Sequence, residues 1–586
     1  MKLKRDRPTI GVLAGWQVYA GALDTFLGPV YHGIRAAAQN LGCNLLLSCS
    51  IDLGTARGSP RLAWPILAPD TDFAPVGPWN TDGLIVVGQS RSDTQAVYLQ
   101  HIAATGHPLV FVGAGESGPS VIADNEGGIR QAFVHLIEHG HRRIAFIAGM
   151  KDKRGDSARR LRAYQELMQE YQLGVDERLI AYGFHSFDGG QQAMKHILES
   201  GAPFTAVLAS NDRSALGAIR ALTDAGIAVP QEVAVIGFDD RIEATAHIPP
   251  LTTVRYPAFE EGYQGVALLL EYIEGKRHET CTIRIPTRLV IRESCGCLPG
   301  VLMAGPPNVE TLPDIRDAER LAPQIAQLMA DKMMPQIQRL GADEVYRLCL
   351  HLVEAFVATI ETGKPLTFHM ALRQTLRHIM SREEDLCTWQ AAISSLRASL
   401  PFICRRLSPL LTPKQVEELL DQARLAIGEA LHEQYTRHLI RQARVAEYVG
   451  RMTARFFAAQ DEAALFDVLS QSLPETGIRH VTVAFYEPES EDPVAWSVLQ
   501  VPQRMKGTRL HTRQFPPPGL YPEDEPFSLA VLPLLIQDRV HGFVAFDTGN
   551  LEPCAEIVRQ LGVALEVYGC TGRRWRANGW PRKRVA

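Results

Sequence analysis

The chain has 586 residues, of which 46% are hydrophobic and 21% charged, with 47 glycines and 37 prolines. These values are ordinary for globular proteins and exclude a mostly disordered, collagen-like or coiled-coil chain, while the length predicts several domains. The formal net charge of −5 excludes a polybasic character of the whole chain, although it is compatible with a local basic patch.

The sequence carries no signal for the membrane or for secretion. No run of about 18 apolar residues occurs, so we expect no membrane-spanning helix. The apolar run at residues 10–15 is interrupted too early to form the core of a signal peptide. We therefore expect a cytoplasmic protein.

The ten cysteines are scattered along the chain, which argues against a disulfide scaffold. The one tight pair is Cys295 and Cys297, separated by a single glycine. One intervening residue is poor spacing for a zinc knuckle, and no Cys or His pair lies near it in the sequence. We expect two reduced thiols, and neither a metal nor a cofactor.

Short apolar runs and amphipathic segments alternate over residues 1–297. Continuous apolar runs separated by helical patterns are typical of parallel strands buried on both faces. The sequence therefore predicts a two-lobed α/β domain with doubly wound parallel sheets. Strand patterns occur at residues 9–14, 44–48, 83–88, 109–113, 143–148, 206–209 and 233–237, and helical patterns at 31–41, 129–139, 159–171 and 214–225.

The pattern changes twice after this domain. Residues 298–313 are rich in Pro and Gly, which predicts a linker. In residues 314–460, apolar residues recur at spacings of three and four positions, which predicts a helical bundle. Residues 461–567 then predict an α+β domain, with a hairpin turn at Asp538–Arg539 and a closing helix over 556–567.

Polar side chains follow two of the predicted strands. Ser210, Asn211 and Asp212 lie between a strand and a helix, and Asp239 and Asp240 follow the strand at 233–237. Ligands of α/β folds bind at the carboxyl ends of parallel strands, and carboxylates with amides suit a polyhydroxylated ligand. The alternative, that such side chains cap helices or hold turns, stays open.

Residues 1–297 resemble the ligand-binding core of LacI-type regulators and of periplasmic sugar-binding proteins. The resemblance rests on VIADNEGGIRQAFVHLIEHGHRRIAFIAG at 121–149, on LASNDRSALGAIRALTDAGIAVPQEVAVIGFDD at 208–240 and on PPLTTVRYP at 249–257. It implies a cleft that closes on a small ligand, and a homodimer.

The same resemblance implies the residues that contact the ligand. These are Asn211, Asp239 and Arg160, and Trp16 and Tyr19 are candidates to stack on a sugar face. The alternative for the two aromatic residues is packing on the core.

Two features depart from the LacI-type pattern. Only eight residues precede Thr9, so we expect no helix-turn-helix in front of the core. The ending RLVIRESCGC resembles cores that are fused to bacterial kinases and cyclases. Residues 461–567 resemble a GAF domain through LAVLPLLIQDRVHGFVAFD, which is similar to its central hairpin.

Residues 568–586 form a basic tail. The tail contains six arginines and lysines, two tryptophans and no acidic residue, which is compatible with binding to nucleic acid or to an anionic membrane. Codons can be chosen for residues 567–586 such that a reading frame shifted by two bases encodes LRLYREAVEGERLAEEAS, an amphipathic helical sequence; that the gene uses such codons is a hypothesis. We therefore favour a frameshifted or truncated tail over a purposeful basic one.

The sequence shows no ATP cradle and no nucleophile–base set, so we expect no enzyme activity. The leading hypothesis is a small-molecule sensor of a bacterial signalling or transcription-regulatory protein, with a sugar- or nucleoside-like ligand whose binding is relayed through the helices and the GAF-like domain. One alternative is a LacI-type transcription regulator that contacts DNA through its tail or a partner. Another is the sensory fragment of a histidine kinase or diguanylate cyclase.

Overall fold

The computed structural model describes most of the chain, which divides into two compact units. The first comprises residues 1–296 with 445–586, and the second comprises 297–444. No helix among the described residues is long and apolar enough to cross a membrane. The described residues are 7–19, 27–52, 75–88, 93–113, 118–151, 155–297, 321–334, 337, 340–382, 384, 386–406, 410–476, 478–487, 494–501, 505–522, 524–536, 539–547 and 551–567.

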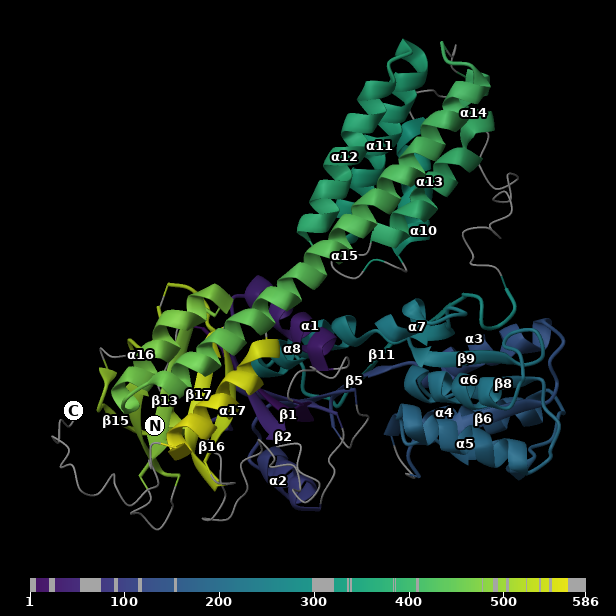
Figure 1. Ribbon diagram of the computed structural model, residues 1–586. Helices are drawn as coiled ribbons and strands as arrows, with labels where there is room; N and C mark the ends of the chain where they lie inside the picture. The colour runs from purple at the N-terminus through teal and green to yellow at the C-terminus, as the bar shows by residue number, and fades with distance from the viewer. Residues whose placement is uncertain are drawn as a thin grey trace. The chain divides into compact units, whose positions relative to one another are not determined.

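The N-terminal lobe of the first unit contains a parallel sheet in the order β11-β5-β4-β3-β1-β2 (Figure 1). All residues of β3, β4 and β5 are buried, as their apolar runs predict. The strands are β1 (Thr9–Tyr19), β2 (Asn44–Asp52), β3 (Gly83–Val87), β4 (Leu109–Val112), β5 (Ser120–Ala123) and β11 (Thr282–Ile285), and the helices are α1 (Leu27–Asn40), α2 (Asp93–Ala104) and α8 (Ala258–Ile273).

The C-terminal lobe contains a second sheet in the order β12-β10-β9-β8-β6-β7, in which only the β10–β12 pair is antiparallel. Helices α4, α5 and α6 accompany its strands in Figure 1. The strands are β6 (Ile144–Ala148), β7 (Ile180–Tyr182), β8 (Ala206–Ala209), β9 (Ala234–Asp239), β10 (Thr252–Arg255) and β12 (Arg288–Val290), and the helices are α3 (Asn125–Glu138), α4 (Gly155–Glu170), α5 (Phe187–Glu199), α6 (Asp212–Asp224) and α7 (Ile242–Ala246).

The chain passes between the two lobes three times. It crosses from β5 to α3, returns from β10 to α8, and crosses again from β11 to β12. The hydroxyl of Thr287 donates to the carbonyl of Asp124 at 2.8 Å, which joins two of these crossings. The two-lobed, doubly wound α/β fold predicted from the sequence is therefore confirmed.

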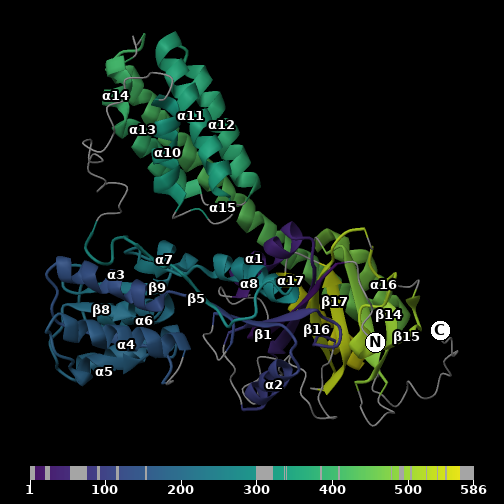
Figure 2. The ribbon, with the colours of Figure 1, turned by 180° about the vertical axis from the view of Figure 1, so that it is seen from behind.

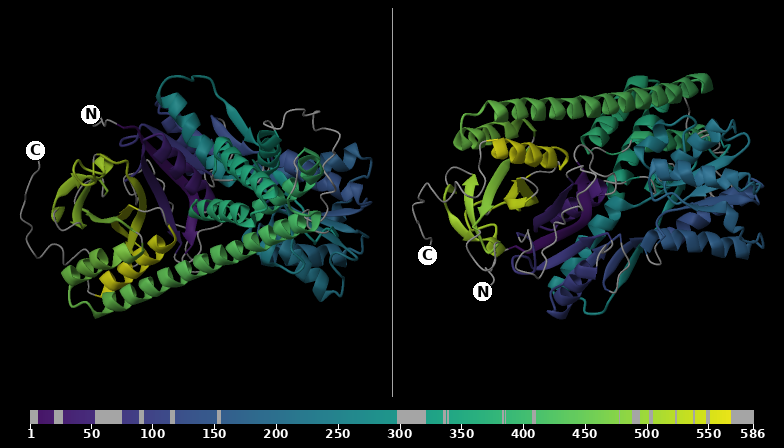
Figure 3. Two further views of the ribbon diagram at one scale, coloured as in Figure 1. Left: turned by 90° about the horizontal axis from the view of Figure 1, so that it is seen from above. Right: turned by 60° about the horizontal axis from the view of Figure 1, so that its bottom comes forward.

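The second unit is helical, as its apolar periodicity predicts (Figure 2). Its core includes the large buried side chains Phe356, Phe368 and Trp389. The predicted bundle ended at residue 460, whereas the compact helical unit ends at Arg444 and the last helix continues without a break (Figure 3). The helices are α10 (Leu321–Met333), α11 (Ala342–Thr362), α12 (Pro365–Ser381), α13 (Trp389–Ala398), α14 (Leu400–Arg406) and α15 (Pro413–Ala458).

The C-terminal part of the first unit is an α+β domain built on an antiparallel sheet in the order β16-β17-β13-β14-β15. The predicted hairpin is present as the β16–β17 pair, while the tail at 568–586 lies outside the described residues. The elements are α16 (Glu462–Ser472), β13 (His480–Tyr486), β14 (Trp496–Val501), β15 (Arg509–His511), β16 (Ser528–Ile536), β17 (Arg539–Asp547) and α17 (Glu552–Val567).

The α+β domain extends the sheet of the N-terminal lobe, which the sequence did not predict. Strand β16 pairs in parallel with β2 in the register Leu46 with Leu529, and the backbone N–H of Leu45 donates to the carbonyl of Phe527 at 2.9 Å. Leu46, Leu529 and Phe543 belong to one buried apolar cluster. The two parts therefore share both a sheet and a hydrophobic core.

Candidate functional site

A buried arginine contacts several elements at the carboxyl ends of the strands in the C-terminal lobe. The guanidinium of Arg160, on α4, donates from Nε to Oδ1 of Asn125 at 2.7 Å and from Nη1 to the carbonyl of Ser210 at 2.5 Å. Its Nη1 also lies 3.4 Å from Oδ1 of Asp239. Because α/β folds bind ligands at this edge of the sheet, the structure brings two of the predicted residues, Arg160 and Asp239, together at the expected place.

Aromatic rings hold the guanidinium in position. The guanidinium carbon of Arg160 lies 3.7 Å from the ring centroid of Phe238 and 5.8 Å from that of Tyr256. Stacking on an aromatic face stabilises a cation and limits its rotation. Only 4% of the Arg160 side chain is exposed, so its orientation is set by packing as well as by hydrogen bonds.

Asp239 combines burial with a strained backbone. It is the last residue of β9, and its φ of +114° lies in a region that residues other than glycine rarely adopt. Burial raises the pKa of its carboxyl to about 6, although the nearby charges of Arg160 and Arg241 lower it. Since 30% of the side chain stays exposed, the carboxylate is available to accept hydrogen bonds from a ligand.

Both carboxylate oxygens of the neighbouring Asp240 are hydrogen bonded to arginine side chains of the protein. Arg255 donates to its Oδ2 at 2.6 Å and Arg292 to its Oδ1 at 2.5 Å. Of the two consecutive aspartates, Asp240 therefore links the end of β9 to β10 and to the segment after β12, while Asp239 faces the arginine of the site.

The Ser-Asn-Asp segment after β8 serves a local structural role. Oδ1 of Asn211 accepts from the backbone N–H of Ser214 at 3.0 Å and caps α6, and its Nδ2 donates to the carbonyl of His185 at 3.2 Å. Asp212 is fully buried and accepts from the hydroxyl of Thr253 and the backbone N–H of Arg241. The capping alternative thus describes what these side chains do here, and a ligand contact of Asn211 stays a prediction.

Trp16 and Tyr19 lie within the first strand rather than after it. The sequence predicted a strand over residues 9–14, whereas β1 continues to Tyr19 across an irregularity between Leu13 and Gln17. The side chains of both aromatic residues lie outside the described part of the structure, so their stacking on a ligand stays a prediction.

Several polar residues near the site were missed by the sequence analysis. Nδ2 of Asn125 donates to Oδ1 of Asp156 at 2.9 Å, and the hydroxyl of Tyr256 donates to Oε1 of Glu261 at 3.1 Å. Burial raises the pKa of Asp156 and raises that of Glu261 well above its usual value. The available signal was the pair Asp124–Asn125 at the start of α3, which repeats the polar strand-to-helix pattern of Ser-Asn-Asp.

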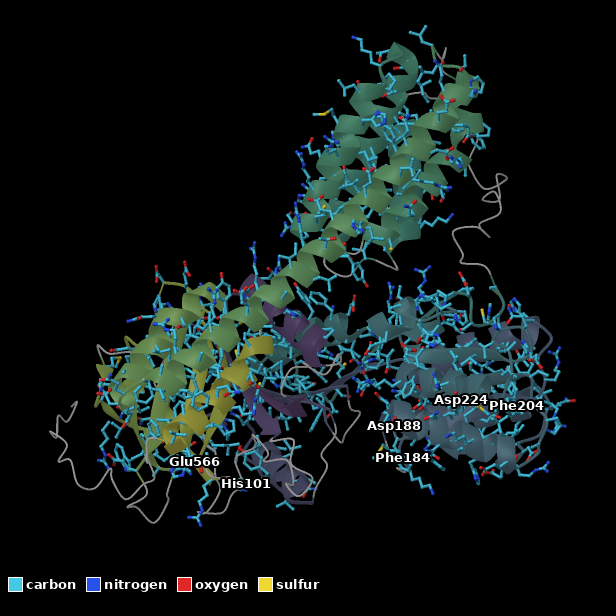
Figure 4. All side chains as sticks on the ribbon, in the orientation of Figure 1. His101, Phe184, Asp188, Phe204, Asp224 and Glu566 are labelled. Atoms are coloured by element: carbon cyan, nitrogen blue, oxygen red, sulfur yellow. The ribbon has the colours of Figure 1, made fainter. Side chains whose placement is uncertain are left out.

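A Ser–His contact lies on the Asn211 side of the site. The hydroxyl of Ser157 and Nε2 of His185 are 2.6 Å apart. His185 belongs to the segment between β7 and α5, which Figure 4 marks with the label Phe184. These groups add hydrogen-bonding capacity of both kinds to a site suited to hydroxyl groups.

A second polar cluster lies beside the Cys295–Cys297 pair, for which the sequence predicted neither a metal nor a cofactor. The sequence places no histidine pair near it, but the fold brings His135 and His139 of α3 beside it. Candidate ligand atoms of His135, His139 and Cys297 all lie within 4.8 Å of one another. The fold therefore brings together imidazole and thiol groups that are far apart in the sequence.

Comparison with known proteins identifies the two-lobed region. Residues 133–295 match the family described as a periplasmic binding protein-like domain. The HTH-type transcriptional regulator CelR of Thermobifida fusca is 36% identical over 220 residues, which are 37% of this chain and 64% of CelR. The HTH-type transcriptional regulator DegA of Bacillus subtilis is 30% identical over 272 residues, which are 46% of this chain and 77% of DegA.

The solved structures include a regulatory protein of LacI family from Chloroflexus aggregans, with a TM-score of 0.42 and 26% identity. The match covers 49% of this chain and 98% of that one. Among the curated relatives, the chain spans less than two thirds of CelR, 64% of its length.

Proposed function

The chain belongs to the LacI-type family, and we propose that it is a transcription regulator whose two-lobed domain binds a small polyhydroxylated ligand of the sugar class. The single observation that carries this proposal is the contact of Arg160 with Asp239 at the carboxyl ends of the C-terminal strands. A carboxylate accepts two hydroxyl hydrogen bonds while the guanidinium donates to further oxygens, which is the chemistry that a sugar presents.

The relatives favour a regulator over the sensory part of a kinase or cyclase. CelR and DegA are both named transcriptional regulators. The expected mechanism is a shift between open and closed lobes, in which the ligand stabilises the closed state because it contacts both lobes.

The shared sheet supports a route by which this shift reaches the C-terminal domain. A movement of the N-terminal lobe displaces β2, and β16 is hydrogen bonded to β2 over Ser528–Val531. The α+β domain is therefore expected to move with the N-terminal lobe as one body. Its assignment as a GAF-like domain stays a prediction that this arrangement neither requires nor excludes.

DNA binding is part of the proposal and has its own test. In full-length protein, the affinity for promoter DNA is expected to fall steeply with salt, because phosphate contacts release counterions. Deletion of residues 568–586 should reduce that slope if the basic tail contacts DNA. An unchanged slope would place the DNA contacts outside the tail, whereas no binding by the purified chain would assign DNA contact to a partner protein. We also propose a homodimer, for which light scattering of the full-length chain is the test.

Ligand binding is tested on the full-length chain with a panel of sugars, polyols and nucleosides. A sugar that raises the melting temperature should lose this effect in Arg160→Met. A nucleoside hit with the same dependence would keep the site but change the ligand class. A panel without any hit would remove the support for a sugar-responsive regulator.

A further inference from the structure

Two histidines and two cysteines converge where the chain leaves the two-lobed domain. His135 and His139 lie four residues apart at the end of α3, and therefore on one face of the helix. Cys295 and Cys297 follow β12 in a short turn. Nε2 of His135 lies 3.4 Å from Sγ of Cys295, and the ligand atoms of His135, His139 and Cys297 lie within 4.8 Å of one another.

These separations approach those of a tetrahedral zinc site. With bonds of about 2.1 Å to nitrogen and about 2.3 Å to sulfur, neighbouring ligand atoms lie about 3.4–3.8 Å apart. The His135–Cys295 separation already matches, and the separations among His135, His139 and Cys297 exceed these values by no more than about 1.4 Å, which side-chain rotations can close. Two thiolates would also neutralise a divalent charge.

Hydrogen bonds around the cluster favour the metal-binding form of an imidazole and of a thiol. Nδ1 of His139 lies 2.7 Å from the carbonyl oxygen of His135, which favours the proton on Nδ1 and leaves Nε2 for a metal. The hydroxyl of Thr252 donates to Sγ of Cys295 at 3.1 Å, as expected for a partner that stabilises a thiolate. Outer contacts of this kind orient the ligands of metal sites.

The turn between the cysteines has a conformation that suits this arrangement. Gly296 has a φ of +89°, which side-chain-bearing residues rarely adopt, and its backbone N–H donates to the carbonyl of Glu293 at 2.9 Å. This conformation brings two thiols with a single residue between them to the same end of α3.

We propose that His135, His139, Cys295 and Cys297 form a structural site for a zinc-class divalent cation. The cation ties α3 to the segment that leads from the two-lobed domain into the helical unit. The identity of the cation follows from the ligands, because mixed imidazole and thiolate sets favour Zn²⁺ over Mg²⁺ and Ca²⁺. The site is separate from the Arg160 site and does not depend on the proposed regulation of transcription.

Cobalt(II) is the probe that tests this site. Full-length protein stripped with a chelator and kept reduced is titrated with Co²⁺, and we expect one equivalent to give the intense visible bands of tetrahedral coordination with a thiolate charge-transfer band. Zn²⁺ should then displace the cobalt and bleach both. His139→Asn should weaken cobalt binding by at least about 100-fold, because removing a ligand costs more than removing an outer contact, for which the loss reaches about 100-fold. Cys297→Ser should reduce the charge-transfer intensity by about half.

Matched variants separate loss of the site from loss of folding. His141→Asn removes a nearby histidine outside the cluster, and Cys387→Ser removes an exposed cysteine elsewhere. Both should bind cobalt as the wild type does. His139 is exposed, so its substitution should leave the circular dichroism spectrum unchanged. Weak octahedral bands, or tetrahedral bands that persist in both His139→Asn and Cys297→Ser, would overturn the proposal.

Discussion

Arg160 and Asp239 lie 79 positions apart in the sequence, yet Nη1 of the arginine is 3.4 Å from a carboxylate oxygen of the aspartate. The arginine comes from α4 and the aspartate from the end of β9. Their meeting depends on the parallel order of β6, β8 and β9, which brings the carboxyl ends of these strands to one edge.

Removing the arginine should destabilise the protein as well as the site. In Arg160→Met, the amide oxygen of Asn125 and the carbonyl of Ser210 lose their donor, and Asp239 keeps a charge without its partner. Breaking a buried pair in this way costs about 3–5 kcal/mol, measurable by urea unfolding. Arg130→Met removes an exposed ion pair with Glu170 and should change stability little. Equal losses in the two variants would contradict the role given to Arg160.

The stability contribution of Asp239 should depend on pH. Folding raises the pKa of its carboxyl from 3.8 to about 6, so the folded protein binds this proton more tightly than the unfolded chain does. Its contribution is therefore fully present below about pH 4 and is lost as the pH rises towards about 6. The difference in unfolding free energy between wild type and Asp239→Asn, measured across this range, should change accordingly. A constant difference would show that the carboxyl titrates normally.

Ligand affinity should show the opposite pH dependence. An ionised Asp239 accepts hydrogen bonds from ligand hydroxyls, while its protonated form loses part of that capacity. Affinity is thus expected to fall below about pH 6, by up to tenfold per unit, and to be pH-independent in Asp239→Asn. Calorimetric titrations between pH 5 and pH 8 would measure both. An affinity that rises on acidification would exclude the carboxylate as an acceptor.

Two glycines allow α1 and α8 to approach closely. A Cβ at Gly262 would lie 2.1 Å from the carbonyl oxygen of Val30, and one at Gly33 would lie 2.0 Å from that of Phe259. Gly262→Ala should therefore destabilise the protein by about 1–3 kcal/mol through overpacking. Gly28→Ala, on α1, meets no atom within 4 Å and should be neutral or slightly stabilising in the same thermal melts. The reverse order of stabilities would contradict this packing.

The shared sheet predicts that the two-lobed domain is not independent of the C-terminal domain. A fragment of residues 1–297 exposes the edge of β2, and unpaired strand edges promote aggregation. Light scattering should therefore detect large assemblies of the fragment. In the full-length chain, Leu529→Lys places a charge in the common core, whereas Val563→Lys alters a side chain that is 41% exposed. Only the first should lower the melting temperature, and a monodisperse, stable fragment would contradict the shared core.

The sequence predicted what depends on local periodicity and on the known family pattern. The buried strands β3 and β4, the helical unit and the β16–β17 hairpin follow directly from apolar spacing. The β2–β16 pairing could not be found in this way, because both strands are apolar runs and their partners lie more than 480 positions apart. The register shift between Leu13 and Gln17 interrupts the apolar pattern of β1, so the extension of this strand to Tyr19 was missed.

Contacts between distant residues limited the prediction of the sites in the same way. Arg160 and Asp239 were proposed from the resemblance, and the fold brings them together. Asn125 was missed because an Asp-Asn pair at the start of a helix has an ordinary capping interpretation, and Asp124 does cap α3. The histidines beside Cys295 were missed because they lie 160 positions away on α3, and their spacing becomes informative only in the folded chain.

The most direct test of the ligand-binding account is a calorimetric titration of the full-length chain with the sugar selected from the panel. The account predicts one saturable site in the wild type and in Asp224→Ala, which alters an exposed aspartate of the same lobe. In Asp239→Ala the binding heat should be lost while the fold is retained. Equal affinity in Asp239→Ala and in the wild type would contradict the assignment of the site.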